Sequence, residues 1–152
     1  MARVLIIGCG CRGRALGRDL IVDGHAVRGT TRDPARAREL EAEGIEPWIA
    51  DPERIATIAS ALDRVAIMVV LLGSATGPAE ALHGTRLEML LLRTIDTAVR
   101  GVVYEAAGTV DQAVLDAGAA IVRSACERSR IPVAVIDAAP GAARAAIDGL
   151  LR

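Results

Sequence analysis

Strand-like and helix-like segments alternate along the whole chain. Apolar, often β-branched runs are separated by stretches that carry apolar residues at helical spacing. The runs are Arg3–Gly8, His25–Thr30, Ile45–Ala50, Arg64–Leu72, Gly101–Ala106 and Ile131–Asp137. Because they are almost continuously apolar, they predict strands that are buried on both faces of a parallel sheet. We expect a doubly wound α/β fold with about six mainly parallel strands in the order 3-2-1-4-5-6.

Residues typical of helix ends support this segmentation. Asp33-Pro34 and Asp51-Pro52 each put a capping carboxylate before a proline suited to the first helical position, and Gly44 stands where a glycine commonly ends a helix. Later segments have an apolar face at helical spacing. They predict helices in Pro78–Val99 and Val110–Arg128, and the Ala-rich stretch Pro140–Leu151 can form a last helix.

The composition narrows the class of protein. A chain of 152 residues that is 52% hydrophobic, with a formal net charge of -1, can form one core and has no electrostatic reason to bind nucleic acid. We expect a single domain over residues 1–152. The apolar runs are shorter than a membrane span, three cysteines make no disulfide framework, and no leader-like segment precedes the first strand. These features predict a cytoplasmic protein without a membrane partner.

A glycine-rich turn joins the first predicted strand to the first helix. The segment Gly8-Cys9-Gly10-Cys11-Arg12-Gly13 follows an apolar run directly and matches G-x-G-x-x-G. In this pattern Gly8 permits the turn, Gly10 lets the backbone approach a phosphate, and Gly13 allows close packing of helix on strand. The helix that begins at Arg12 offers exposed amides and a dipole that favours an anion. We expect Gly8, Gly10, Cys11, Arg12 and Gly13 to contact a dinucleotide; a tight turn without a ligand is the alternative.

The end of the second strand indicates which dinucleotide is bound. An acidic residue about 20 positions beyond the turn would bind a ribose 2′-hydroxyl and favour NAD, but no acid stands there. The Thr31 hydroxyl and the Arg32 guanidinium suit a 2′-phosphate, which Arg12 could reach from the other side. The expected cofactor is therefore NADP in preference to NAD. A solvated charge is the alternative for Arg32, and Arg36 and Arg38 are assigned to an exposed helix face.

Two further strand ends supply candidate contacts. Asp51 follows the third strand, where a side chain can touch adenine, although capping of the next helix is its larger expected role. Leu72 and Gly73 end the fourth strand at the edge of the crevice, and Gly73 would let a cofactor ribose approach the backbone.

Three stretches point together to a family. They are the glycine turn, Gly29-Thr30-Thr31-Arg32-Asp33-Pro34 and Ile131-Pro132-Val133-Ala134-Val135-Ile136. In this combination the chain resembles the atypical short-chain dehydrogenase/reductases, including the NmrA-like group. The resemblance implies an NADP-binding Rossmann-like domain, often followed in relatives by a small substrate-binding portion.

The catalytic pattern of that family is missing here. The family has a Ser or Thr near the end of the fifth strand and a Tyr followed four residues later by Lys. Tyr104 lies inside the fifth predicted strand with Gly108 at the fourth following position, and the chain contains no lysine. Glu105 is a candidate general acid, because burial at the end of an apolar strand would raise its pKa. A structural hydrogen bond to a loop or a partner subunit is its alternative role, so the catalytic residues are unknown.

No set of residues predicts a metal site. Cys9 and Cys11 lack the remaining ligands of a zinc site, and His25 and His83 have no further ligand at a suitable spacing. We expect both histidines at the surface or in turns and Cys126 in the core. Oxidation of Cys11 beside the helix N-terminus is an alternative to its role as a small residue in the turn.

Two functions from different classes fit these features. The first is an NADP-dependent oxidoreductase that lacks the usual Tyr-x-x-x-Lys pair. The second is a non-catalytic NADP-sensing or regulatory protein, whose contacts change when the nucleotide binds. Either one has a small-molecule nucleotide as its partner, and a homodimer formed through the long fourth and fifth helices is a further hypothesis.

Overall fold

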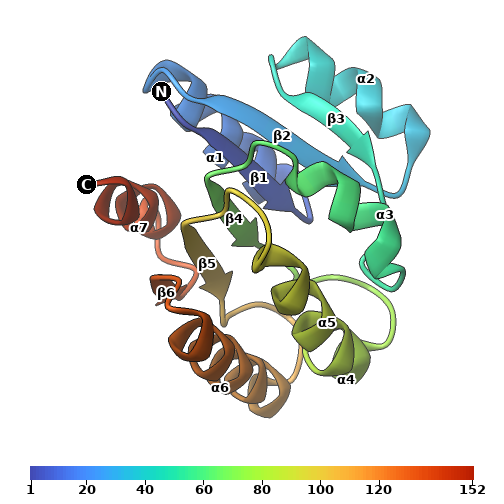
Figure 1. Ribbon diagram of the computed structural model, residues 1–152. Coiled ribbons are helices and arrows are strands. Elements are labelled where there is room, and N and C mark those ends of the chain that lie inside the picture. The colour runs from blue at the N-terminus through green and yellow to red at the C-terminus, as the bar shows by residue number, and fades with distance from the viewer.

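A parallel sheet of six strands runs through the middle of the molecule, as the computed structural model of residues 1–152 shows (Figure 1). The strand order is β3-β2-β1-β4-β5-β6, and every neighbouring pair is parallel. This confirms the predicted doubly wound α/β fold and its strand order. The strands are β1 (Arg3–Ile7), β2 (Ala26–Thr31), β3 (Glu46–Ile49), β4 (Ile67–Val70), β5 (Gly101–Glu105) and β6 (Val133–Ile136).

Helices cover both faces of the sheet. Their bounds are α1 (Cys11–Val22), α2 (Pro34–Ala42), α3 (Ile55–Ala59), α4 (Ala79–Leu82), α5 (Thr85–Thr94), α6 (Gln112–Ser129) and α7 (Ala142–Leu151), with a 3-10 turn at Ser60–Leu62. In Figure 1, α1 and α7 lie on one side of the central strands and α5 and α6 on the other. None of the helices has the length and apolar character needed to cross a membrane.

Alternate residues of the central strands belong to two separate cores. In β1, Leu5 and Ile7 pack in a core with α3, α5 and α6, whereas Val4 and Ile6 pack in a second core with α1, α2 and α7. All four side chains are completely buried. Burial on both faces explains why β1 and β4 are continuous apolar runs in the sequence.

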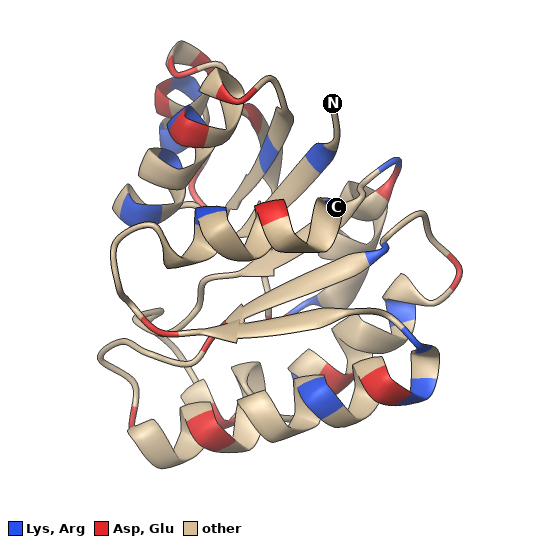
Figure 2. Ribbon diagram, turned by 90° about the vertical axis from the view of Figure 1, so that its left-hand side faces the viewer, with Lys and Arg blue, Asp and Glu red and all other residues tan.

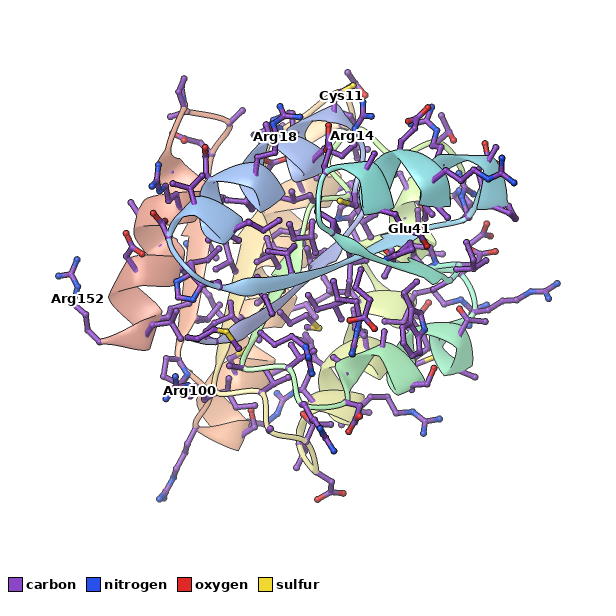
Figure 3. The ribbon with its side chains drawn as sticks, turned by 90° about the horizontal axis from the view of Figure 1, so that it is seen from above. Cys11, Arg14, Arg18, Glu41, Arg100 and Arg152 are labelled. Atoms are coloured by element: carbon purple, nitrogen blue, oxygen red, sulfur yellow. The ribbon has the colours of Figure 1, made fainter.

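Charged residues lie mainly on the helices, where acidic and basic positions are interspersed (Figure 2). Two ion pairs join α1 to the end of α2: Arg14 binds Glu39 at 3.0 Å and Arg18 binds Glu43 at 2.7 Å. Arg14 and Arg18 follow Cys11 on successive turns of α1 (Figure 3). These contacts hold α1 beside the C-terminal half of α2.

The predicted helix over Pro78–Val99 is wrong in its extent. The structure has a short α4, a break at Gly84 and a separate α5 that ends at Thr94. A Cβ at Gly84 would lie 2.5 Å from the carbonyl oxygen of Glu80, so the break requires a glycine. At the other end, the hydroxyls of Thr94 and Thr97 donate to the backbone carbonyls of Leu91 and Thr94, and such bonds compete with helix continuation.

The third helix also begins later than predicted. Pro52 is not its first residue, because α3 starts at Ile55 after a turn. Asp51 caps that turn instead: its carboxylate accepts from the backbone N–H of Glu53 at 2.9 Å. By contrast, α2 begins as predicted, with Pro34 in its first turn and the Asp33 carboxylate accepting from the N–H of Ala35.

Candidate functional site

A crevice of about 770 Å³ opens at the carboxyl ends of the strands. It is bounded by the glycine turn, the end of β2, the segment after β3 and the segment after β4, with Glu105 of β5 at its far side. Every residue expected to contact the cofactor lines this crevice except Gly73; these residues are Gly8, Gly10, Cys11, Arg12, Gly13, Thr31, Arg32, Asp51 and Leu72. The fold thus gathers residues that are scattered over the first half of the sequence.

The glycine turn is fastened to the end of β2. The Gly8 N–H donates to the Thr30 hydroxyl at 3.1 Å, and the Cys9 N–H donates to the Thr30 carbonyl at 3.2 Å. Gly8 has φ +87°, and a Cβ there would lie 2.4 Å from the carbonyl oxygen of Leu71. The turn therefore needs glycine at this position both for its conformation and for its close approach to the segment after β4.

Gly10 and Gly13 are glycines for different reasons. A Cβ at Gly13 would lie 3.2 to 3.3 Å from Gly8, Ile6 and Cys9, so Gly13 allows α1 to pack closely on β1. A Cβ at Gly10 would meet no atom within 4 Å, although Gly10 lines the crevice. Nothing in the protein's own packing requires glycine there, so the bare backbone is left for a ligand to approach.

The N-terminus of α1 has no internal partner for its amides. Gly10 is the N-cap residue, it has no side chain to cap the helix, and the first turn contains no acid. The first N–H groups of a helix are unpaired unless a side chain, water or ligand accepts from them. They lie beside the crevice, where the helix dipole favours an anion such as a phosphate.

The end of β2 supplies positive charge and no free acid. Asp33 is the nearest carboxylate, and it is engaged in capping α2. The Arg32 guanidinium reaches the segment after β4, where Nη2 donates to the Thr76 hydroxyl at 3.3 Å. Arg36 also lines the crevice, although the sequence assigned it with Arg38 to an exposed helix face. Two arginines, Arg32 and Arg36, therefore line the crevice beside the end of β2.

The segment after β4 places its two candidate residues differently. Leu72 lines the crevice, but Gly73 packs against the loop after β5, where a Cβ would lie 1.8 Å from the carbonyl oxygen of Ala107. The close approach that requires glycine is therefore to this loop, not to a ribose. Ser74 and Thr76, which are not among the predicted contacts, also line the crevice. The Ser74 hydroxyl accepts from the Thr109 N–H at 3.1 Å.

An ion pair crosses the crevice from the glycine turn to β5. Arg12 Nη1 donates to Glu105 Oε1 at 2.7 Å, and Nη2 donates to Oε2. The Glu105 side chain is 3% exposed and the Arg12 side chain 53%. Burial raises the pKa of Glu105 above its usual value, and the hydrogen bonds and charge of Arg12 oppose this rise. Arg12 is thus directed toward β5 and away from the end of β2, contrary to the expectation that it reaches a 2′-phosphate.

The expected surface position of His83 is wrong. His83 is 2% exposed, Nε2 lies 3.0 Å from the carbonyl oxygen of Leu72, and Nδ1 lies 2.6 Å from the Tyr104 hydroxyl. Because a carbonyl only accepts, Nε2 carries the proton and Nδ1 accepts from Tyr104. Burial lowers the pKa of His83 and raises the pKa of Tyr104 to about 12. Tyr104 is therefore held below the crevice in a structural hydrogen bond.

The cysteines and acidic residues form no metal centre. No group of three or more His, Cys, Asp or Glu side chains is placed to hold an ion. Cys9 and Cys126 are buried, and burial raises the pKa of both thiols. Cys11 is exposed at the start of α1, where Arg14 Nη2 lies 3.5 Å from its sulfur (Figure 3).

A family model described as the NAD binding domain of 6-phosphogluconate dehydrogenase matches residues 3–85, which are more than half of the chain. The chain belongs to this family. The match covers the glycine turn, the end of β2 and the segment after β4. It establishes an NAD(P)-binding Rossmann domain and does not confirm the NmrA-like subtype. No curated protein matches the chain by sequence.

Solved structures of other proteins share the fold of this NAD-binding domain. Vestitone reductase from alfalfa is 16% identical, with a TM-score of 0.71 over 89% of this chain and 56% of that one. An Agrobacterium tumefaciens superfamily member with bound NAD is 18% identical, with a TM-score of 0.69 over 88% and 48%. An NADPH-dependent quinone oxidoreductase from Escherichia coli is 20% identical, with a TM-score of 0.63 over 87% and 46%. The chain spans about half the length of these structures.

Proposed function

We propose that the chain binds NADP in the crevice, in preference to NAD. The observation that carries this proposal is the end of β2, where Arg32 and Arg36 line the crevice and the carboxylate that follows this strand, Asp33, caps α2. An arginine pair suits a 2′-phosphate, whereas a ribose 2′-hydroxyl needs an acceptor that Asp33 is not free to supply. The Thr31 side chain adds a hydroxyl at the same place, although it already accepts from the Asp33 N–H at 3.2 Å.

The rest of the proposed site follows the crevice from one end to the other. The pyrophosphate lies over Gly8, Gly10 and Gly13 at the first turn of α1, beside Cys11 and Arg12. Adenine lies near Asp51, whose carboxylate is fixed by the Glu53 N–H. The nicotinamide half extends along Leu72 toward Glu105. A dinucleotide in this orientation contacts segments that follow β1, β2 and β3 as well as segments at the ends of β4 and β5.

Titration of NADP and NAD tests the preference. We expect NADP to bind at least about tenfold more tightly, since a charge-assisted hydrogen bond contributes about 1.5–3 kcal/mol. Arg32→Ala should weaken NADP binding by a similar factor and leave NAD binding nearly unchanged. Arg38→Ala is the matched control, because Arg38 lies on α2, shortly after Arg32 in the chain, is exposed and does not line the crevice. Equal affinities of the wild-type protein for the two nucleotides would refute the preference.

An oxidoreductase needs an acid that the usual Tyr and Lys do not supply here. NADPH, when bound, supplies a hydride, and the protein has to orient the partner and provide a proton. Glu105 is the buried carboxyl nearest the expected nicotinamide position, and it also borders a second cavity of about 260 Å³ between α1, β6 and α7. That second cavity is our proposed place for a small carbonyl or quinone substrate.

A non-catalytic sensor is the second candidate. The buried Tyr104–His83 hydrogen bond and the absence of lysine favour it, because neither a tyrosine nor an ammonium group faces the crevice. NADPH oxidation with a panel of aldehydes, ketones, quinones and flavins separates the two. Turnover that is lost in Glu105→Gln supports the oxidoreductase, whereas tight NADP binding without any turnover supports the sensor.

We also propose one domain over residues 1–152 and a homodimer that forms through α5. Met89, Leu92 and Ile95 are large apolar side chains with exposed fractions of 41%, 66% and 53%, and they lie on or directly after α5. Light scattering at micromolar concentration tests the dimer, and a monomer mass would exclude it. The cytoplasmic location stays a prediction from the sequence.

A further inference from the structure

The Arg12–Glu105 ion pair joins a buried group to a movable one. Glu105 is the last residue of β5, so its carboxylate is held in place by the sheet. Arg12 is in the first turn of α1, and about half of its side chain is exposed. Both residues line the large crevice and the smaller cavity, so the pair forms part of the wall between them. A change in this pair therefore alters both spaces.

A dinucleotide in the crevice introduces a second anion for the same guanidinium. Arg12 is within the turn that faces the pyrophosphate in the proposed complex, and a guanidinium binds phosphate, as it binds carboxylate, through bidentate charge-assisted hydrogen bonds. Arg12 is long, flexible and half exposed, so it can turn toward the phosphate. Glu105 cannot follow it, because its backbone is fixed in β5 between β4 and β6 and its side chain is buried.

The surroundings of Glu105 offer no replacement cation. α1 contributes Asp19, the segment after β6 contributes Asp137, and α7 contributes Arg144, which is already engaged in an ion pair with Asp23. The segment after β4 and the end of β6 contribute apolar side chains, Leu71 and Ile136. A buried carboxylate without a counter-ion costs several kcal/mol, and such a group takes up a proton instead.

We propose that a bound dinucleotide takes Arg12 from Glu105, and that Glu105 is protonated in the complex. Cofactor binding then takes up about one proton at any pH between the pKa of Glu105 in the free protein and its higher pKa in the complex. Since the complex holds the extra proton, the dissociation constant rises as the pH rises through this window. This inference rests on the proposed nucleotide binding and states in addition that this binding is coupled to protonation of Glu105.

Isothermal titration calorimetry with NADP tests the coupling. Titrations at one pH in buffers of different ionisation enthalpy give the number of protons taken up, and the series is repeated between about pH 5.5 and 8. The 2′-phosphate of NADP itself titrates near pH 6, so the contribution of Glu105 is the difference between the wild-type protein and Glu105→Gln. Glu127→Gln is the matched control, because Glu127 is exposed on α6 and lines neither cavity.

The expected result is that the wild-type protein and Glu127→Gln take up as much as one proton more per NADP than Glu105→Gln. Their dissociation constants should rise by as much as about tenfold per pH unit relative to that of Glu105→Gln. Glu105→Gln should also bind NADP more tightly at alkaline pH, because the competing carboxylate is gone.

Equal proton uptake by the wild-type protein and Glu105→Gln at every pH would overturn the inference and leave NADP binding intact. Failure of the wild-type protein to bind NADP would refute the proposed function and the inference with it. If Glu105→Gln does not fold, the ¹³C shift of the Glu105 carboxyl carbon in the wild-type protein decides. It should move to the protonated value on NADP binding, and an unchanged shift would overturn the inference.

Discussion

Replacing Gly10 with alanine should separate ligand binding from folding. Gly10 has φ -84° and ψ -153°, a conformation open to alanine, and the added Cβ meets no atom within 4 Å. Loss of a favourable N-cap residue costs roughly 0.5–1 kcal/mol. Alanine also lowers the conformational entropy of the unfolded chain, which stabilises the folded protein by about 0.4–1 kcal/mol. The free energy of unfolding should therefore change by less than about 1 kcal/mol.

The same methyl group should weaken nucleotide binding strongly. A phosphate oxygen that accepts from a backbone amide lies about 2.9 Å from the nitrogen. A methyl carbon keeps other atoms roughly 3.5–4 Å away, so the pyrophosphate has to retreat from the turn. Losing one charge-assisted hydrogen bond costs about 1.5–3 kcal/mol, which corresponds to a loss of affinity of roughly tenfold to more than a hundredfold.

Fluorescence titration with NADPH measures the affinity, and urea unfolding followed by Trp48 fluorescence measures the stability. Gly8→Ala is the contrasting variant, because Gly8 has φ +87° and its Cβ would lie 2.4 Å from the Leu71 carbonyl oxygen. It should lose more than about 1 kcal/mol of stability. If Gly10→Ala binds NADPH as tightly as the wild-type protein does, the reasoning that its bare backbone faces the phosphates is refuted.

The remaining predictions concern the buried polar groups. The chain has one tyrosine, so ultraviolet absorbance reports the ionisation of Tyr104 alone. We expect this ionisation near pH 12 in the folded protein and near the ordinary value of pH 10 in urea. A transition at pH 10 in the folded protein would contradict the hydrogen bond to His83. Because the pKa of His83 in the folded protein lies below 6.5, the free energy of unfolding should not depend on His83 above pH 6.5 and should fall as the pH drops from there toward the folded pKa. Tyr104→Phe should cost about 1–3 kcal/mol of stability, because it leaves His83 Nδ1 without a donor. Urea unfolding at a series of pH values checks both predictions. Arg28→Met should cost roughly 2–4 kcal/mol of stability, because Arg28 is 5% exposed, donates to the carbonyls of Ala61 and Asp63, and has its guanidinium carbon 4.8 Å from the centroid of the Trp48 ring. A change within about 0.5 kcal/mol, the usual range for surface substitutions, would show that these contacts are dispensable.

The fold was predictable because its signals are local. Each strand is a short apolar run, and each run is followed by a helical segment, so the topology rules for parallel sheets leave few arrangements. Helix ends were less certain where side chains compete for the backbone. Asp51 caps a turn in place of a helix, and Thr94 ends a helix that the apolar pattern alone extends to Val99.

The contacts within the site were harder to predict because they join distant residues. Arg12 and Glu105 are 93 positions apart, and the sequence shows each as an isolated charge in an apolar or glycine-rich setting. The isolated position of Glu105 in an apolar strand does indicate that it has a partner, since a buried carboxylate needs one. His83 was misplaced for a similar reason: its partners, Leu72 and Tyr104, lie on two other elements and follow no spacing rule.

The central position of β1 divides the sheet into two halves that are built from successive parts of the chain. β1, β2 and β3 form one half, and β4, β5 and β6 form the other, so the pairing of β1 with β4 from Val4–Ile67 to Ile7–Val70 is the seam between them. The crevice crosses this seam, with Arg32 on one side and Glu105 on the other. A ligand that spans the seam has to dissociate before the two halves separate, so its binding stabilises the folded chain. The gain is about 2.7 kcal/mol when the ligand concentration is 100-fold above its dissociation constant. Nucleotide supply would then set how often the seam opens, and with it how quickly proteases degrade the chain.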